Sequence, residues 1–366
     1  MDKDKLLVTS TRSIFSFALG FQQFGYIAIM LNSGLTAIQT GLILSSGTVF
    51  TVVFLFLIFA RSHFKYSLSI AYAVSAQVYL VVLVYPHIFG FFLNSVLIGL
   101  SNGIFTSVVV QLVRFNKKEL SLTLALSLST GVLGIGYYAL SFKFPLTYLL
   151  IGLYLVLLLN AVVSIKIPIK SRDLGIRESL KSVFHPYIVT VIFAGAYRGV
   201  ILGTLLPLIL YQVLSINLNS LTYWYMLITV APIPFLLFSY KLPNKAFVLI
   251  SVMIGILALL LSRADSLFYL IILVVLLQAL YALRGPVSEY ALIKYVKGST
   301  RAFSGMDLLS KSFIFISMQG TIFIFYIKEY YLLFVLLFVA EVVSGILVYR
   351  MLTEIESPPR VKTSTS

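Results

Sequence analysis

The sequence predicts an all-α integral membrane protein with twelve transmembrane helices. Three observations support this fold class: 60% of the 366 residues are hydrophobic, only 11% are charged, and the mean hydropathy is +1.03. Soluble domains usually have about 25% charged residues, so this chain has too few charges to cover a water-soluble surface. A membrane-spanning helix needs about 20 apolar residues, so twelve such helices leave room only for short loops and not for a soluble catalytic domain.

Twelve apolar runs are long enough to be spans, and each is expected to be one helix. They lie near 12–31, 39–60, 67–85, 88–112, 120–141, 145–165, 184–212, 219–239, 246–262, 267–293, 302–326 and 331–350. All of them should be helical, because a backbone in hydrocarbon must satisfy its own hydrogen bonds. The runs 88–112, 184–212 and 267–293 are long enough to be tilted in the membrane.

The basic residues predict the orientation of these helices. With the N-terminus in the cytoplasm, the loops alternate between the inner and the outer side. Of the 27 Lys and Arg residues, three then lie in outer segments (Lys143, Arg263 and Lys328), three lie inside spans, and the remaining 21 lie in inner segments. Cytoplasmic loops are enriched in Lys and Arg, so we expect a multi-pass protein of the cell membrane with both termini in the cytoplasm. This enrichment also explains the net charge of +15 without a nucleic-acid partner.

The chain divides into two similar halves. A shift of 180 residues aligns segment 112–117 with segment 292–297 and places Arg61 on Lys241. Because each half has six spans, both halves should have the same orientation, which makes the repeat parallel. The expected organisation is a six-helix bundle over 1–165, a basic cytoplasmic linker over 166–183 that can hold a short surface helix, a second six-helix bundle over 184–352, and a disordered cytoplasmic tail over 353–366.

This layout resembles the major facilitator superfamily of secondary transporters. The signature of that family between helices 2 and 3 is Gly-x-x-x-Asp-Arg-x-Gly-Arg-Arg, and the matching segment here, 56–65, is Phe-Leu-Ile-Phe-Ala-Arg-Ser-His-Phe-Lys. Arg61 and Lys65 match the pattern, whereas its acid and both glycines are replaced. The segment 283–302 is similar to helix 10 and its exit loop. The expected fifth helix lacks the Gly-Pro pair of the antiporter motif, so that motif does not indicate antiport.

The resemblance implies a secondary active or facilitative transporter that moves a small polar or anionic solute by alternating access around a midplane cavity between the bundles. It implies a monomer in the lipid bilayer, whose partners are a small-molecule solute and a proton or another ion. Two alternatives remain open: a receptor or assembly protein that has this fold but does not transport, and a polytopic membrane enzyme for lipid-linked substrates. With no cysteine, no Gly-Lys-Ser/Thr loop and widely spaced histidines, no cofactor and no metal site are expected.

Charged residues inside the spans are candidates for a functional site, because a charge at mid-membrane costs at least about 2.5–3.5 kcal/mol. Arg198 lies about fourteen residues into its run, a rise of about 21 Å. Arg198 and Arg284 could hold an anionic or carbonyl-bearing solute, or carbonyl groups and a carboxylate could satisfy them within the protein. The three cations in the spans slightly outnumber the acids at the same depth, which favours anionic, zwitterionic or polar solutes over cations.

The acids in the spans have two interpretations, as charge pairs or as coupling sites. Asp307 and Lys311 are one helical turn apart and can neutralise each other, or they can act in proton or solute transfer. Glu341 is expected to be a structural partner of Lys311 or Arg284 rather than a coupling site. Glu289 is expected to be an interfacial charge.

Polar side chains complete the set of cavity candidates. They are Gln22, Gln23, Tyr26 and Asn102 in the first half, and Gln278 and Tyr281 in the span that contains Arg284. Polar residues in spans are also common contacts between helices, so both roles are open. Arg61 and Lys65 are the candidates for a cytoplasmic gate loop.

Overall fold

Helices make up every regular element in the part of the chain that the computed structural model describes. The described residues are 3–59, 66–109, 117–167, 176–206, 208, 211, 216–263, 266–296, 300–327 and 329–356. Within these ranges, nine helices have at least 18 residues and are apolar enough to cross a membrane. The chain is therefore an all-α, multi-pass membrane protein, as predicted, whereas the total of twelve spans stays a prediction.

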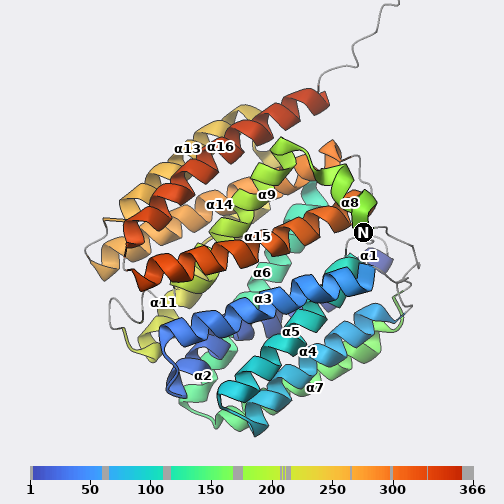
Figure 1. Cartoon of the computed structure of the whole chain (residues 1–366), viewed down its shortest axis with the longest axis vertical. Coiled ribbons are helices and arrows are strands. Elements are labelled where there is room, and N and C mark those ends of the chain that lie inside the picture. Colours follow the sequence, from blue (N-terminus) through green and yellow to red (C-terminus); the bar gives the residue numbers. More distant parts are fainter. Residues whose placement is uncertain are drawn as a thin grey trace, which may run out of the picture.

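The helices of the first half lie together in the lower part of Figure 1. They are α1 (Lys3–Phe21), η1 (Gln22–Tyr26), α2 (Ile27–Asn32), α3 (Ala37–Phe59), α4 (Ser67–Val84), α5 (Ile88–Val109), α6 (Lys117–Ala139), η3 (Leu140–Phe142) and α7 (Leu146–Ser164). The elements α1, η1 and α2 follow one another without a gap, and η1 is a π-helical turn between them. The chain then turns at Gly34, whose φ of 86° is readily adopted only by glycine.

The helices of the second half lie in the upper part of Figure 1. They are α8 (Ile176–Val183), α9 (Pro186–Val200), η4 (Ile201–Leu205), α11 (Leu218–Val230), α12 (Ile233–Phe238), η5 (Ser239–Lys241), α13 (Asn244–Leu261), α14 (Leu267–Tyr295), α15 (Thr300–Tyr326) and α16 (Tyr330–Glu356). The short helix α8 lies in the predicted linker. Residues 353–356 belong to α16 and not to the predicted tail. The helix α14 continues through Pro286, so this proline does not end the helix.

The same helix pairs pack together in both halves. The helix α1 packs on α6 as α9 packs on α15, α3 packs on α5 as α11 and α12 pack on α14, and α4 packs on α7 as α13 packs on α16. In the first half, α1 and α6 approach through glycines, because a Cβ on Gly134 would fall on the carbonyl oxygen of Phe17 and a Cβ on Gly20 on that of Gly131. Small residues at helix contacts let backbones approach closely in membrane proteins.

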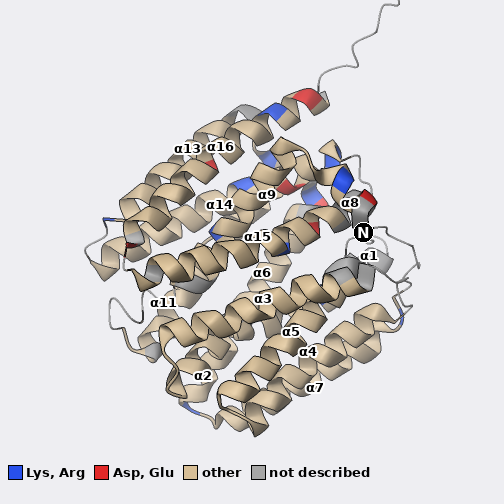
Figure 2. Ribbon diagram, viewed as in Figure 1, with Lys and Arg blue, Asp and Glu red and all other residues tan. Residues whose placement is uncertain are grey.

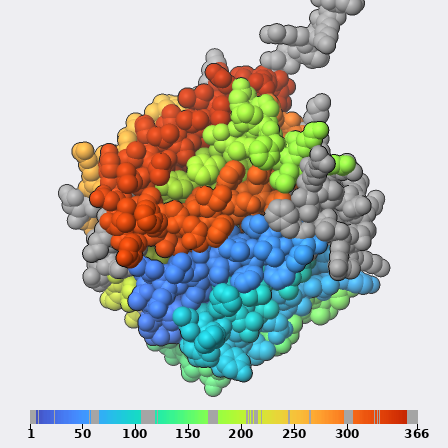
Figure 3. Space-filling view, in the orientation of Figure 1, coloured from blue at the N-terminus to red at the C-terminus, as the bar shows by residue number. Residues whose placement is uncertain are grey.

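The two halves meet along a seam. It is formed by α3 with α15, and by α6 with α11 and α12, and Figure 3 shows α3 in blue beside α15 in orange. The rings of Phe24 and Tyr225 stack across it with their centroids 5.2 Å apart. Nearer to the start of α6, the hydroxyl oxygens of Ser121 and Ser239 lie 2.8 Å apart. Polar and aromatic contacts therefore join the halves at two levels.

Charged residues are distributed unevenly over the molecule. Figure 2 shows most of the blue and red residues at the end where α8 and the chain start lie, while the helices of the first half are almost entirely tan. The second half differs, because α9, α14, α15 and α16 contain charged residues well inside the helices. These residues define the candidate site.

Candidate functional site

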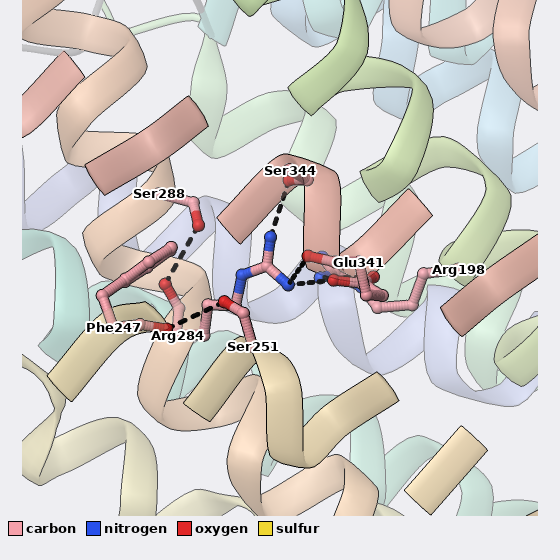
Figure 4. A network of polar contacts seen from close by, with 7 residues as sticks. All are labelled: Arg198, Phe247, Ser251, Arg284, Ser288, Glu341 and Ser344. Carbon is pink, nitrogen blue, oxygen red and sulfur yellow. Dashed lines mark hydrogen bonds and ion pairs between the residues drawn. The ribbon is translucent and has the colours of Figure 1, made fainter. Parts of the chain in front are cut away.

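Three charged residues from separate helices of the second half come together. Arg198 lies on α9, Arg284 on α14 and Glu341 on α16, and Figure 4 shows their side chains converging on the carboxylate. Glu341 is completely buried, and Arg284 is 2% exposed. We refer to Arg198, Arg284 and Glu341 as the charge triad. The sequence predicts each of them as a candidate, and packing of α16 against α9 and α14 brings them into one group.

Both terminal nitrogens of Arg284 have partners inside the protein, whereas its buried Nε has no hydrogen-bond partner among the described residues. Its Nη1 pairs with Glu341 Oε2 and also lies 3.4 Å from the backbone oxygen of Glu341. Its Nη2 donates a hydrogen bond to Ser344 Oγ at 2.6 Å, and the guanidinium carbon is 5.2 Å from the centre of the Phe247 ring. The planar fork of an arginine can hold a carboxylate and a hydroxyl at once, so Arg284 and Glu341 form a fixed pair.

Arg198 is held more loosely than Arg284. Its Nη1 lies 3.7 Å from Glu341 Oε1, which exceeds the usual hydrogen-bond range of about 2.7–3.2 Å. Its guanidinium lies over the ring of Tyr281, 4.4 Å from the ring centre. The Arg198 side chain remains 28% exposed although its partner carboxylate is fully buried. Arg198 therefore points into the interior of the second half and keeps hydrogen-bonding capacity for a further group.

The charge triad has an excess of one positive charge. Two guanidinium groups share one carboxylate, and a guanidinium does not lose its proton in proteins. Asp307 and Lys311 on α15 contribute one charge of each sign and leave the excess unchanged. Because an unbalanced charge is costly away from water, the group favours an anion as its fourth component.

The backbone of α9 leaves space beside Arg198. Gly195, Gly199 and Gly203 follow at four-residue intervals along α9 and η4, and a Cβ at any of them would meet no atom within 4 Å. The π-helical turn η4 begins at Ile201, just after this part of α9. Such turns frequently occur at functional sites in helical proteins. The helix that presents Arg198 is therefore loosely covered at these three glycines.

The polar candidates of the first half form a separate and smaller site. Gln22 and Asn102 line a pocket of about 10 Å³ together with Ser75, Ser101 and Tyr79, which is room for about one water molecule. The hydroxyls of Ser75 and Ser101 are in contact, and Ser101 Oγ donates to the carbonyl oxygen of Ala71 at 2.9 Å. This pocket lies between helices of the first half alone, and the residues that line it are uncharged.

Other predicted cavity residues lie elsewhere. Tyr26 is buried in the first half, and its hydroxyl donates to the carbonyl oxygen of Phe91 at 3.0 Å. Gln278 is half-buried on α14, the helix of Tyr281 and Arg284. The side chain of Gln23 and the whole of Arg61 and Lys65 lie outside the residues that the structure describes.

The remaining charged candidates are not members of the triad. Asp307 and Lys311 are both half-buried on α15. The pairing of Asp307 with Lys311 thus stays a prediction. Glu289 is exposed toward the end of α14, where an interfacial charge is expected.

Sequence reasoning missed two residues that complete the site. Ser344 accepts the second hydrogen bond of Arg284, and Phe247 lies against its guanidinium. The spacing of Glu341 and Ser344 was a usable signal, because residues three apart lie on one face of a helix. Nothing in the sequence around Phe247 marks it as a partner of Arg284.

Comparisons with known proteins address the fold. No protein-family model and no curated protein matches the sequence at a significant level. Solved structures do match: the human organic anion transporter MFSD10 (TETRAN) has a TM-score of 0.74 and 14% identity, and the match covers 95% of this chain and 100% of that chain. A D-xylose-proton symporter has a TM-score of 0.69 and 11% identity, over 96% of this chain and 98% of that chain. The chain has the major facilitator fold.

The resemblance that the sequence indicates is thus confirmed at the level of the fold. Identities of 11% and 14% carry no residue-by-residue correspondence. Within the major facilitator fold of this chain, the charge triad lies entirely in the second half and the small polar pocket entirely in the first.

Proposed function

We propose that the protein is a secondary active or facilitative transporter for a small anionic or polar solute. The charge triad is the observation that carries this proposal, because in the described part of the chain its two arginines share the one carboxylate of Glu341. A charge inside the membrane is costly, and an anionic or strongly polar ligand at Arg198 offsets that cost. The shared fold with an organic anion transporter and a D-xylose-proton symporter supports transport as the function.

The proposal extends to the arrangement of the chain. Twelve spans form two parallel bundles, 1–165 and 184–352, joined by the linker 166–183, and the monomer has both termini in the cytoplasm. The repeated pairing of helices in the two halves supports the repeat, and the charged end of the molecule supports the orientation. Alternating access then opens and closes the seam of α3 with α15 and of α6 with α11 and α12.

Each member of the site has a distinct role in this proposal. Arg198 contacts the solute. Arg284 holds the carboxylate of Glu341 in place, and that carboxylate orients Arg198. Tyr281 supports the guanidinium of Arg198 through its ring face. If transport is coupled to a proton or another ion, the acids that can bind it are Asp307, Glu289 and Glu341.

Thermal unfolding of the full-length protein with a library of small solutes tests the proposal. A bound solute at 100 times its dissociation constant stabilises a protein by about 2.7 kcal/mol, so anionic or polar ligands should raise the unfolding temperature clearly. Arg198→Ala should abolish this shift. Lys294→Ala, which removes an exposed cation of α14, should leave the shift unchanged.

The same solutes are then tested for uptake into proteoliposomes. Uptake of a stabilising anion supports the transporter. Stabilisation without uptake would favour the receptor, and a soluble product released from a lipid-linked substrate would favour the enzyme. Stabilisation by cations in preference to anions, or an equal effect in Arg198→Ala, would contradict the role of the triad.

A further inference from the structure

We infer that the site takes a monovalent anion and that the protein exchanges one such anion for another across the membrane. This inference rests on the proposed function, because it requires that the triad contacts the transported solute. It adds the charge of the solute and the mode of transport. Both follow from counting charges at the site and from the exposure of Arg198.

The charge triad has a single positive excess. Arg198 and Arg284 are positive, and the one carboxylate that they share, that of Glu341, is negative. One bound monovalent anion makes the group neutral. A dianion would leave a negative excess, and an uncharged solute would leave the positive one.

The geometry assigns the missing negative charge to Arg198. Arg284 already has Glu341 Oε2 and Ser344 Oγ as partners and is almost completely buried. Among the described residues, the carboxylate oxygen near Arg198 is the more distant Oε1 of Glu341, at 3.7 Å, and Arg198 is the exposed member of the triad. A ligand oxygen can therefore reach Arg198 without displacing the pair behind it.

The mode of transport follows from the net charge that is buried when the site closes. In alternating access the site is shut off from water on both sides before it opens to the other side. With a monovalent anion bound, closure buries a neutral group. Without an anion, closure removes water from a guanidinium that shares the Glu341 carboxylate with Arg284, and an uncompensated buried charge is strongly unfavourable.

The loaded protein should therefore reorient much faster than the empty one. Net uptake of one anion requires the empty protein to return, whereas exchange requires only loaded protein in both directions. Exchange is thus the fast mode for a site with this charge. A neutral or negative empty site would have no such preference.

Full-length protein in proteoliposomes tests the inference with three aromatic solutes of matched shape. The probes are benzenesulfonate, which has one negative charge, benzene-1,3-disulfonate, which has two, and uncharged benzenesulfonamide. All solutions contain sulfate in place of chloride, so that no small monovalent anion can neutralise the empty site. Uptake of labelled probe is compared between vesicles filled with sulfate and vesicles preloaded with the same unlabelled probe.

We expect benzenesulfonate to enter faster than the other two probes. The ratio of its uptake rate into preloaded vesicles to its uptake rate into sulfate-filled vesicles should be at least about ten. Adding chloride inside the sulfate-filled vesicles should reduce this ratio. Arg198→Gln leaves Arg284 and Glu341 as a balanced pair, so its ratio should fall toward one even though its uptake is weaker. Lys294→Gln changes the total charge equally but lies outside the triad, and its ratio should equal that of the unchanged protein.

The outcomes separate this inference from the proposed function. Equal uptake of benzenesulfonate into both kinds of vesicle would overturn exchange and leave transport standing. Faster uptake of the disulfonate or the sulfonamide would overturn the monovalent anion. Uptake of none of the three probes, together with no thermal stabilisation by any solute of the library, would overturn the proposed function itself.

Discussion

The two halves of the protein are built from the same helix pairs but differ at their centres. In the first half, Gln22 and Asn102 line an uncharged pocket with room for about one water molecule. In the second half, Arg198, Arg284 and Glu341 form a charged group with one excess positive charge. The shared architecture therefore does not impose a shared chemistry, and the second half supplies the charged part of the site.

The first helices of the two halves also differ in their packing. The first helix of the first half lies against α6 so closely that a Cβ on Gly20 or Gly134 would fall on backbone atoms. In the corresponding helix of the second half, Gly195 and Gly199 face open space. The contact of α1 with α6 is thus closely packed, whereas α9 has open space at these two glycines.

The largest effect is expected when the triad loses its carboxylate. Glu341→Gln leaves two guanidinium groups near each other without a negative charge, and removing one partner of a buried ion pair costs about 3–5 kcal/mol. The unfolding temperature in detergent should fall strongly, and much of the protein should aggregate in size-exclusion chromatography.

The control for this substitution is Glu329→Gln, which makes the same chemical change at an exposed position after α15. Its unfolding temperature should stay close to that of the unchanged protein. If the two variants behaved alike, the second half would not depend on the triad, and the contrast between the halves would be lost.

How much of this contrast the sequence could predict depends on the kind of feature. The fold class and the location of the charged candidates follow from local composition, because a charge inside an apolar run is visible in the sequence itself. Which charges meet is a different matter. The sequence leaves Lys311 and Arg284 as possible partners of Glu341. The packing of α16 against α9 and α14 makes Arg284 and Arg198 the partners that the structure shows.

The polar candidates of the first half were harder to place for a specific reason. Gln22, Gln23 and Tyr26 all lie in η1, a π-helical turn, where the regular angular spacing of an α-helix does not hold. Directions derived from 3.6 residues per turn therefore fail there. Tyr26 lies inside the first half against Phe91.

A smaller loss is expected when the second hydrogen bond of Arg284 is removed. Ser344→Ala leaves Nη2 of a buried guanidinium without its 2.6 Å partner, and hydrogen bonds to charged groups contribute about 1.5–3 kcal/mol. The variant should unfold at a clearly lower temperature. Ser312→Ala serves as its control, because the Ser312 hydroxyl donates to the carbonyl oxygen of Leu308 in its own helix; an equal loss in both would argue against a special role of the triad in stability.

The difference in packing predicts opposite results for one substitution at two sites. Gly134→Ala places a methyl group on the backbone of α1, and such overpacking typically costs about 1–3 kcal/mol. Gly195→Ala meets no atom within 4 Å and should be neutral or stabilising by up to about 1 kcal/mol, since alanine favours helices. Thermal unfolding of both variants measures the difference. A loss at Gly195 as large as at Gly134 would mean that α9 is as tightly covered as α1.

The smallest effect is expected in the polar pocket of the first half. Ser75→Ala removes a hydroxyl that contacts Ser101, but Ser101 Oγ keeps its hydrogen bond to the carbonyl oxygen of Ala71 at 2.9 Å. The remaining partner is therefore satisfied, and the cost should not exceed the about 0.5–1.5 kcal/mol of an ordinary hydrogen bond. Because this pocket is uncharged, stabilisation by anionic solutes should be the same in Ser75→Ala as in the unchanged protein. A variant that folds normally but loses the anion effect would show that the first half takes part in anion binding, which the separation of the two sites argues against.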